Sequence, residues 1–233
     1  YPDRDFTFGG TLVDQGDLFL HGNEEESKAL NYLGNTHGGM LNIGEAWYIF
    51  YHRQTNQHSY SRQACAERLE HPAPGVFKQA EVTSCGLNGG PLSGTGRYEA
   101  RIACNLWSKN GVARYDQKFD KKAHPYFTQT GKDRMENGDQ YIANMRDGAV
   151  AGFKYFGFGG EKRISLTVSG VCSGIVEVSH TPDFKAVIAR IPVSAKVEQE
   201  NAEGAFAPQK GTQPLYFRYT GEGVMNFHTF EMR

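Results

Sequence analysis

Two short clusters of polar and aromatic residues hold the side chains best suited to chemistry. Residues 35–39 include His37, residues 51–56 include Arg53, and Arg62 follows soon after. Guanidinium groups, imidazoles and amides are planar donors that can fork onto hydroxyls or carboxylates, so they suit a sugar held against aromatic rings. For any one of these residues taken singly, a capped position at the end of a strand is the alternative.

A strand must position the second cluster. Alternation along residues 47–53 places the odd-numbered side chains, including Arg53, on one face and the even-numbered ones, including His52, on the other. A strand that ends in His and Arg brings charged donors to the rim of a sheet, where binding sites are commonly built.

The composition is that of a folded domain whose net charge is close to zero. The 233 residues are 39% hydrophobic and 22% charged, and 25 Lys and Arg balance 26 Asp and Glu. This size fits one large domain or two small ones. The balance of charge lacks the basic stripe of nucleic-acid-binding proteins, so we expect no nucleic-acid partner. No apolar run approaches the ~18 residues that a spanning helix needs, so we expect no membrane partner.

Strand signals recur along the chain, and almost nothing is helical. The 28 glycines and 9 prolines punctuate short β-branched and aromatic runs. The predicted strands are residues 10–13, 39–43, 46–51, 98–106, 140–144, 151–156, 163–168, 174–179, 186–193, 214–219 and 225–232. We therefore predict an all-β fold.

The four cysteines do not form a metal motif. Cys65, Cys85, Cys104 and Cys172 are far apart and lack CxxC or Cys/His ligand spacing, which argues against zinc. Their even number permits two disulfides, but a chain of this length does not need them, so free structural thiols are favoured. The compartment, extracellular or cytoplasmic, stays open.

The two halves of the chain differ in the regularity of their strand patterns. From residue 163 onward the runs are regular and separated by turn signals, as in a sandwich or jelly roll. In residues 186–193, Val187, Ala189, Ile191 and Val193 share one face and Arg190 lies on the other. Residues 107–124 are charged and weakly periodic, so we place the join there and predict a joining segment at 96–122.

The first half resembles the last blade of a known propeller enzyme family. The similar stretches are residues 6–13, 34–39 (Gly-Asn-Thr-His-Gly-Gly), 47–56, 60–67 and 79–92. Together and in this order they resemble glycoside hydrolase family 43, which contains β-xylosidases and α-L-arabinofuranosidases. The resemblance implies that residues 1–95 are the last blade or blades of a five-bladed β-propeller.

The resemblance also implies that the reaction's carboxylates lie elsewhere. Family 43 enzymes are inverting, and their base and acid, about 6.5–9.5 Å apart, come from earlier blades. A blade needs roughly 40–50 residues, so residues 1–95 hold little more than one. We therefore expect no catalytic residue in this chain, and we expect the N-terminal portion of the same enzyme as a second chain.

Individual residues match family positions. His37 matches a histidine near the propeller axis, beside the catalytic acid or a central calcium ion, although a core histidine between glycines is the alternative. Arg62 matches an arginine that reaches into the sugar subsite, and Arg53 is a second substrate-binding candidate. For Arg62 the alternative is a surface ion pair with Glu67, which we interpret as an arginine partner, while Glu81 is interpreted as structural.

The second half is similar to family 6 carbohydrate-binding modules. Residues 174–178, 187–193 and 223–230 carry this resemblance, which implies a β-sandwich at 123–233 and a sugar contact from Asn226. Phe227 stands where those modules usually have tryptophan, and their early Glu-x-Glu calcium signature is missing. A sandwich that only braces the propeller is therefore the alternative.

These observations predict part of a hydrolase acting on xylan or arabinoxylan oligosaccharides. The alternative is a non-catalytic carbohydrate-binding or scaffold module. Sequence does not separate xylosidase from arabinofuranosidase activity, because specificity depends on pocket loops.

Overall fold

Strands dominate the computed structural model, which describes residues 3, 5–20, 22–58, 60–114, 122–131, 138–207 and 209–233. Helical structure in these residues is limited to three 3-10 turns, η1 (Glu26–Lys28), η2 (Gly86–Asn88) and η3 (Ala100–Ile102). The prediction of an all-β chain is confirmed. None of the described helices is long and apolar enough to cross a membrane.

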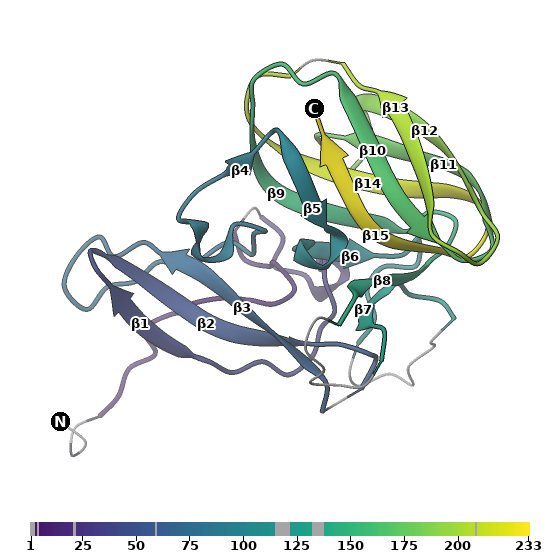
Figure 1. Cartoon of the computed structure of the whole chain (residues 1–233). Helices are drawn as coiled ribbons and strands as arrows, with labels where there is room; N and C mark the ends of the chain where they lie inside the picture. Colours follow the sequence, from purple (N-terminus) through teal and green to yellow (C-terminus); the bar gives the residue numbers. More distant parts are fainter. Residues whose placement is uncertain are drawn as a thin grey trace.

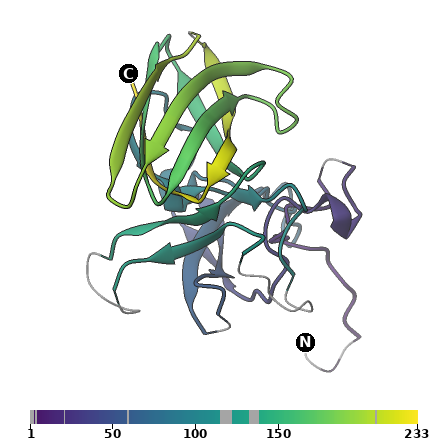
Figure 2. The same cartoon turned by 90° about the vertical axis from the view of Figure 1, so that its right-hand side faces the viewer.

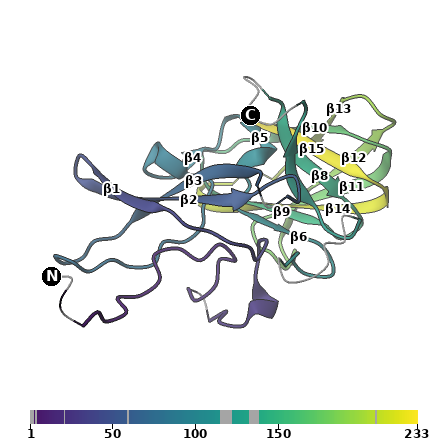
Figure 3. The same cartoon turned by 90° about the horizontal axis from the view of Figure 1, so that it is seen from below.

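A three-stranded antiparallel sheet forms the smaller part of the molecule. It consists of β1 (Gly39–Ile43), β2 (Ala46–Gln54) and β3 (Arg62–Leu69), in that order. It lies below and to the left of strands β9 to β15 in Figure 1 and extends away from them in Figure 3. The described residues form no propeller, so the predicted propeller blade stays a proposal.

The larger part is a sandwich of two six-stranded sheets, whose strands face each other in Figure 2. One sheet has the order β13-β10-β15-β8-β7, with β5 also paired to β15, and the other has the order β12-β11-β14-β9-β4, with β6 also paired to β9. The first sheet contains β13 (Glu200–Ala205), β10 (Arg163–Ser169), β15 (Met225–Met232), β8 (Gln140–Met145), β7 (Tyr126–Gln129) and β5 (Gly96–Glu99). The second contains β12 (Val187–Ala195), β11 (Cys172–Ser179), β14 (Gly211–Gly223), β9 (Val150–Phe158), β4 (Leu92–Ser93) and β6 (Asn105–Trp107).

The predicted joining segment contributes strands to this sandwich. β5 pairs with β15, and β6 pairs with β9. The 98–106 run is broken by η3, so it forms two short strands in different sheets instead of one. Residues 115–121 of the joining segment lie outside the described residues. The sandwich therefore begins before residue 123, because β4, β5 and β6 pair with its strands β9 and β15.

Alternation explains the sandwich core. In β12, Ala189, Ile191 and Val193 are buried while Arg190 is exposed, as the sequence pattern predicts. The inward side chains of both sheets join one hydrophobic core that includes Phe153, Phe217 and Phe230.

Candidate functional site

The predicted His37 and Arg62 come together at the rim of the three-stranded sheet. His52 of β2 lies between them: its ring meets that of His37 edge-on at 4.5 Å between centroids, and its Nε2 contacts a guanidinium nitrogen of Arg62. Because Arg62 pairs with Gln54, it lies on the same face of the sheet as His52. These three side chains are called the rim cluster below.

Glycine brings His37 over the sheet. A Cβ atom on Gly38 would lie 1.8 Å from the carbonyl oxygen of Phe50, so only glycine allows the chain to approach β2 so closely. The approach is fixed by the Thr36 hydroxyl, which donates to the carbonyl of His52 at 2.9 Å.

The rim cluster is a set of donors without a carboxylate. Partial burial lowers the pKa of His52, and the neighbouring Arg62 and His37 lower it further. A neutral imidazole can accept a hydrogen bond from one hydroxyl and donate a hydrogen bond to another, and the neighbouring guanidinium adds further donors. The cluster can therefore orient a sugar or a carboxylate, but it cannot itself supply the two carboxyl groups of a glycosidase.

Arg53 lies on the opposite face and is already engaged. Its guanidinium donates to the backbone carbonyls of Ala103 and Arg101 and to the side chain of Gln63, and it stacks 3.5 Å from the centre of the Phe127 ring. The structure therefore separates Arg53 from Arg62, and the contacts of Arg53 join β2 to the sandwich.

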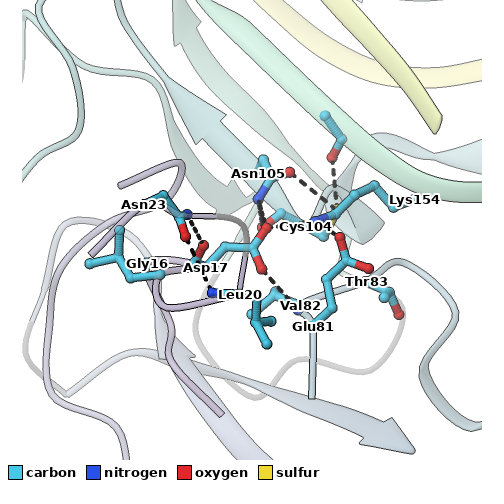
Figure 4. Close-up of polar contacts among 12 residues, drawn as sticks. Gly16, Asp17, Leu20, Asn23, Glu81, Val82, Thr83, Cys104, Asn105 and Lys154 are labelled. Atoms are coloured by element: carbon cyan, nitrogen blue, oxygen red, sulfur yellow. Dashed lines mark hydrogen bonds and ion pairs between the residues drawn. The ribbon is translucent and has the colours of Figure 1, made fainter. Parts of the chain in front are cut away.

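A buried charge network joins the segments before β1 and after β3 to the sandwich (Figure 4). The Nζ atom of Lys154, in β9, lies 2.5 Å from Asp17 Oδ2 and 2.8 Å from Glu81 Oε1, and the side chains of Lys154 and Asp17 are 4% and 1% exposed. Asn105 donates to Asp17 Oδ2 at 3.1 Å, and the backbone NH of Val82 donates to Oδ1 at 3.2 Å. Burial alone would lower the pKa of Lys154, but Cys104, Asp17 and Glu81 raise it above its ordinary value.

The carboxylates of the first half are held by the protein. Glu67 is 3% exposed and accepts hydrogen bonds from the backbone and hydroxyl of Thr83 and from Tyr51. The interpretation of Glu67 as an arginine partner is wrong, because its side chain is buried on the face away from Arg62. Glu81 accepts from Lys154 and from the Tyr155 hydroxyl, which agrees with a structural role.

Asn226 lies in the sandwich, on β15, among polar neighbours. Its Oδ1 accepts from the backbone NH of Asn144 at 3.2 Å, and its Nδ2 donates to the Ser169 hydroxyl at 3.4 Å. Phe227 is 1% exposed and faces the core, so it offers no ring to a ligand. The ring pair on the Asn226 face is His228 stacked on Tyr141 at 4.6 Å.

The donors near His37 do not fit calcium. Calcium takes six to eight oxygen ligands, whereas the rim cluster offers imidazoles and a guanidinium. In the part of the chain that the structure describes, no three His, Cys, Asp or Glu side chains gather where they could hold a metal ion. All four cysteines are free thiols, and burial raises the pKa of Cys104 to about 12.

Sequence reasoning missed that Asp17 and Lys154 belong to one buried network, and it did not place His52 between His37 and Arg62. Asp17 and Lys154 are 137 positions apart, and neither belongs to a motif. One signal was available: Lys154 stands within a run of aromatic strand residues, Phe153-Lys154-Tyr155-Phe156, and a buried lysine needs a partner of opposite charge.

One curated protein and several solved structures are similar to this chain. No family model matches the chain. A curated protein named xylosidase/arabinosidase, from Thermoclostridium stercorarium, is 38% identical over 234 residues, covering 100% of this chain and 49% of that relative. A crystal structure of a glycoside hydrolase family 43 arabinoxylan arabinofuranohydrolase from Bacillus subtilis, in complex with cellotetraose, matches with a TM-score of 0.56 at 18% identity, covering 100% of this chain and 45% of that one. The module CsCBM6-3 from Clostridium stercorarium, solved with cellobiose, matches 62% of this chain and 97% of its own at a TM-score of 0.49 and 14% identity.

The chain is therefore related to carbohydrate-active enzymes along its whole length. Specifically, it is homologous to a xylosidase/arabinosidase, and it shares the fold of the matching part of a family 43 arabinofuranohydrolase. It spans about half the length of the curated relative it matches.

Proposed function

We propose that this chain is part of an inverting glycoside hydrolase of family 43 type, which removes α-L-arabinofuranosyl or β-D-xylosyl units from arabinoxylan or xylan. The observation that carries the proposal is the 38% identity to a xylosidase/arabinosidase over all of this chain and 49% of that relative. In this proposal β1, β2 and β3 belong to the last blade of a five-bladed propeller, and the sandwich is an accessory carbohydrate-binding-type module.

The reaction's carboxylates would come from the portion of the enzyme outside this chain. Asp17, Glu67 and Glu81 are each engaged by protein donors, which supports this division. In the whole enzyme, that N-terminal portion would pack against the face of the small sheet that carries the rim cluster.

Arg62 would be the main contribution of this chain to the sugar pocket. An arginine facing a base and an acid holds both carboxyl groups in place and lowers the pKa of the base through its positive charge. His37 and His52 would keep the guanidinium oriented and donate to sugar hydroxyls. Arg53 would act as a positioning residue that fixes β2, since its donors are taken by Ala103, Arg101 and Gln63.

Two further roles belong to the complete enzyme. A calcium ion near His37 would need oxygen ligands from other segments, and no step of the reaction here depends on it. Asn226 would contact sugar only if ligand displaced its hydrogen bonds to Asn144 and Ser169.

A hybrid enzyme tests the proposal. This chain should replace the matching half of the Thermoclostridium relative, and hydrolysis of aryl α-L-arabinofuranoside and aryl β-D-xyloside should be measured. We expect the folded hybrid to cleave at least one substrate with inversion of the anomeric centre, and this chain alone to be inactive. Robust activity of this chain alone, or a folded but inert hybrid beside an active parent relative, would contradict the proposal.

A further inference from the structure

A cavity of about 280 Å³ lies between the small sheet and the sandwich. Its walls come from segments far apart in the sequence, represented by Gln15, Tyr32, Gln57, Trp107 and Tyr126. Arg53 and Gln54, neighbours on β2 whose side chains lie on opposite faces, both line it, so the cavity lies at the end of this strand. None of the three rim-cluster side chains is among its described lining residues.

Two of the side chains that line this cavity each carry a buried polar atom without a hydrogen-bond partner. The two atoms are Gln15 Oε1 and Gln57 Nε2, and the only other such atom in the described residues is His180 Nε2. The Gln15 amide is fixed, because its Nε2 donates to the carbonyl of His52 at 3.1 Å and the side chain belongs to a residue that is 4% exposed. Buried polar atoms are rarely left unpaired, so one unpaired acceptor and one unpaired donor on the same cavity point to a missing ligand.

The turn that carries Gln57 is held in a demanding conformation. Asn56 and Gln57 have φ values of 55° and 51°, and the NH of His58 donates to the carbonyl of Thr55 at 3.1 Å. Such a turn favours glycine at its second central position, where Gln57 stands. The backbone NH of Asn56 donates to the carbonyl of Phe127 at 2.8 Å, which anchors the turn to the strand β7 beside the cavity.

The lining selects an uncharged ligand rich in hydroxyl groups. Among the described residues, the lining contains no Asp, Glu or Lys, and the donors of its arginine, Arg53, are taken by protein acceptors. A hydroxyl group both donates and accepts, so hydroxyl groups suit an unpaired acceptor such as Gln15 Oε1 as well as an unpaired donor such as Gln57 Nε2. The rings of Tyr32, Trp107 and Tyr126 add apolar surface for the carbon side of such a ligand. The volume lies at the small end of ligand pockets, which run from roughly 300 Å³ upward.

We infer that this cavity is a binding subsite for one neutral sugar unit, at the junction of the small sheet and the sandwich. The choice of pentoses as the sugars to test rests on the proposed function, whereas the cavity and its unpaired atoms do not. The subsite would hold a glycan next to the reaction site without taking part in bond cleavage.

Tryptophan fluorescence can report on this cavity directly. The chain has two tryptophans, Trp47 and Trp107, and only Trp107 lines the cavity. In a Trp47→Phe background the full chain should be titrated with D-xylose, L-arabinose, xylobiose and glycerol. We expect a saturable change in emission with at least one sugar, and a comparison of the monosaccharides with xylobiose tells whether a free sugar or a chain end is preferred.

Gln57→Gly is the decisive variant, because glycine fits the left-handed backbone at this position. We expect it to weaken sugar affinity about tenfold or more, while the melting temperature stays the same or rises. Asn201→Ala, at an exposed position of β13 in the sandwich, should keep the affinity of the parent. The inference is overturned if Gln57→Gly binds like its parent, if glycerol binds as well as the sugars, or if no sugar gives a saturable change. Activity of the hybrid enzyme is a separate readout, so failure here would leave the proposed function standing.

Discussion

The two parts of this molecule are stabilised in different ways. The sandwich packs five phenylalanines, each at most 1% exposed, whose rings meet at centroid distances of 4.8–6.2 Å. These are Phe153, Phe156, Phe217, Phe227 and Phe230. The small sheet buries only Ile49, Leu69 and Ala80 in its hydrophobic cluster, and Leu41 and Ile43 of β1 are about half exposed.

Polar contacts compensate for the small core of the three-stranded sheet. Lys154 reaches from the sandwich to Asp17 and Glu81, and Arg53 reaches from the small sheet to Ala103 and Arg101. A hydrophobic core stabilises without direction, whereas these bonds fix one orientation. The small sheet is therefore positioned by its junction, which keeps the rim cluster at a defined place relative to the sandwich.

Breaking the junction should have the largest effect. In Lys154→Met, Asp17 and Glu81 would lose their buried cation, and we expect the free energy of unfolding to fall by about 3–5 kcal/mol. Urea denaturation measures this loss. Amide hydrogen exchange should show faster opening of β1, β2 and β3 than of β9, because the sandwich keeps its aromatic core.

The matched control is Lys109→Met, which removes an exposed lysine 3.8 Å from Asp147. We expect almost no change there, since exposed ion pairs contribute little. Equal losses in the two variants would show that the buried network has no special role.

Glu67 should make the small sheet sensitive to pH. Burial raises its pKa from the ordinary 4.5 to about 7, despite hydrogen bonds from Thr83 and Tyr51. The folded state then binds a proton that the unfolded chain has already lost, so the free energy of unfolding should fall between pH 4.5 and 7, by up to about 3 kcal/mol.

Glu67→Gln should remove this part of the pH dependence, because glutamine imitates the protonated acid. Exposed Glu45, in the turn between β1 and β2, provides the control, and Glu45→Gln should leave the slope unchanged. Denaturation curves at several pH values measure both slopes, and parallel slopes for Glu67→Gln and the parent would refute the assignment.

Arg62→Ala tests the rim cluster in the hybrid enzyme. We expect kcat/KM to fall about 100-fold, which corresponds to about 2.7 kcal/mol, with little change in stability since Arg62 is exposed. Arg62→Lys should recover only part of the loss, because lysine keeps the charge but not the fork.

Arg68→Ala is the matched control, since Arg68 is exposed on the same face of the same strand, six residues further along. It should retain kcat/KM. A sharp drop in melting temperature of Arg62→Ala with unchanged kcat/KM would instead identify Arg62 as a structural residue.

The smallest effect concerns the exposed edge of the small sheet. β1 is an edge strand, and edge strands with apolar side chains favour association. The double variant Leu41→Lys and Ile43→Lys should reduce self-association in sedimentation experiments while changing stability by less than about 0.5 kcal/mol. The double variant Val171→Lys and Val197→Lys, on the sandwich, should leave self-association unchanged. If this variant reduces self-association and the β1 variant does not, the associating surface lies on the sandwich.

The sequence predicted the sandwich better than the small sheet, for a physical reason. β10 and β15 match their predicted ranges to within one residue, since apolar alternation is visible along each strand. β3 and β13 were missed, because Arg62–Leu69 and Glu200–Ala205 are largely polar and gain their strand conformation from pairing with neighbours. Residues 10–13 form only a bridge between Val13 and Ala80.

The rim cluster was predicted in part, because His37 and Arg62 stand in recognisable motifs. The junction was not predicted, since pairs such as Asp17 and Lys154 join loops and strands that only the tertiary fold brings together.

The most direct test of the central claim is a mass measurement. This chain, 25.9 kDa, should be mixed with the half of the Thermoclostridium relative that it does not match, and the native mass of the mixture determined. If β1, β2 and β3 complete a propeller begun elsewhere, a one-to-one complex should form and should hydrolyse the aryl glycosides. If the two polypeptides stay apart, each at its own mass under conditions where both are folded, the claim that the small sheet is part of such an enzyme is contradicted.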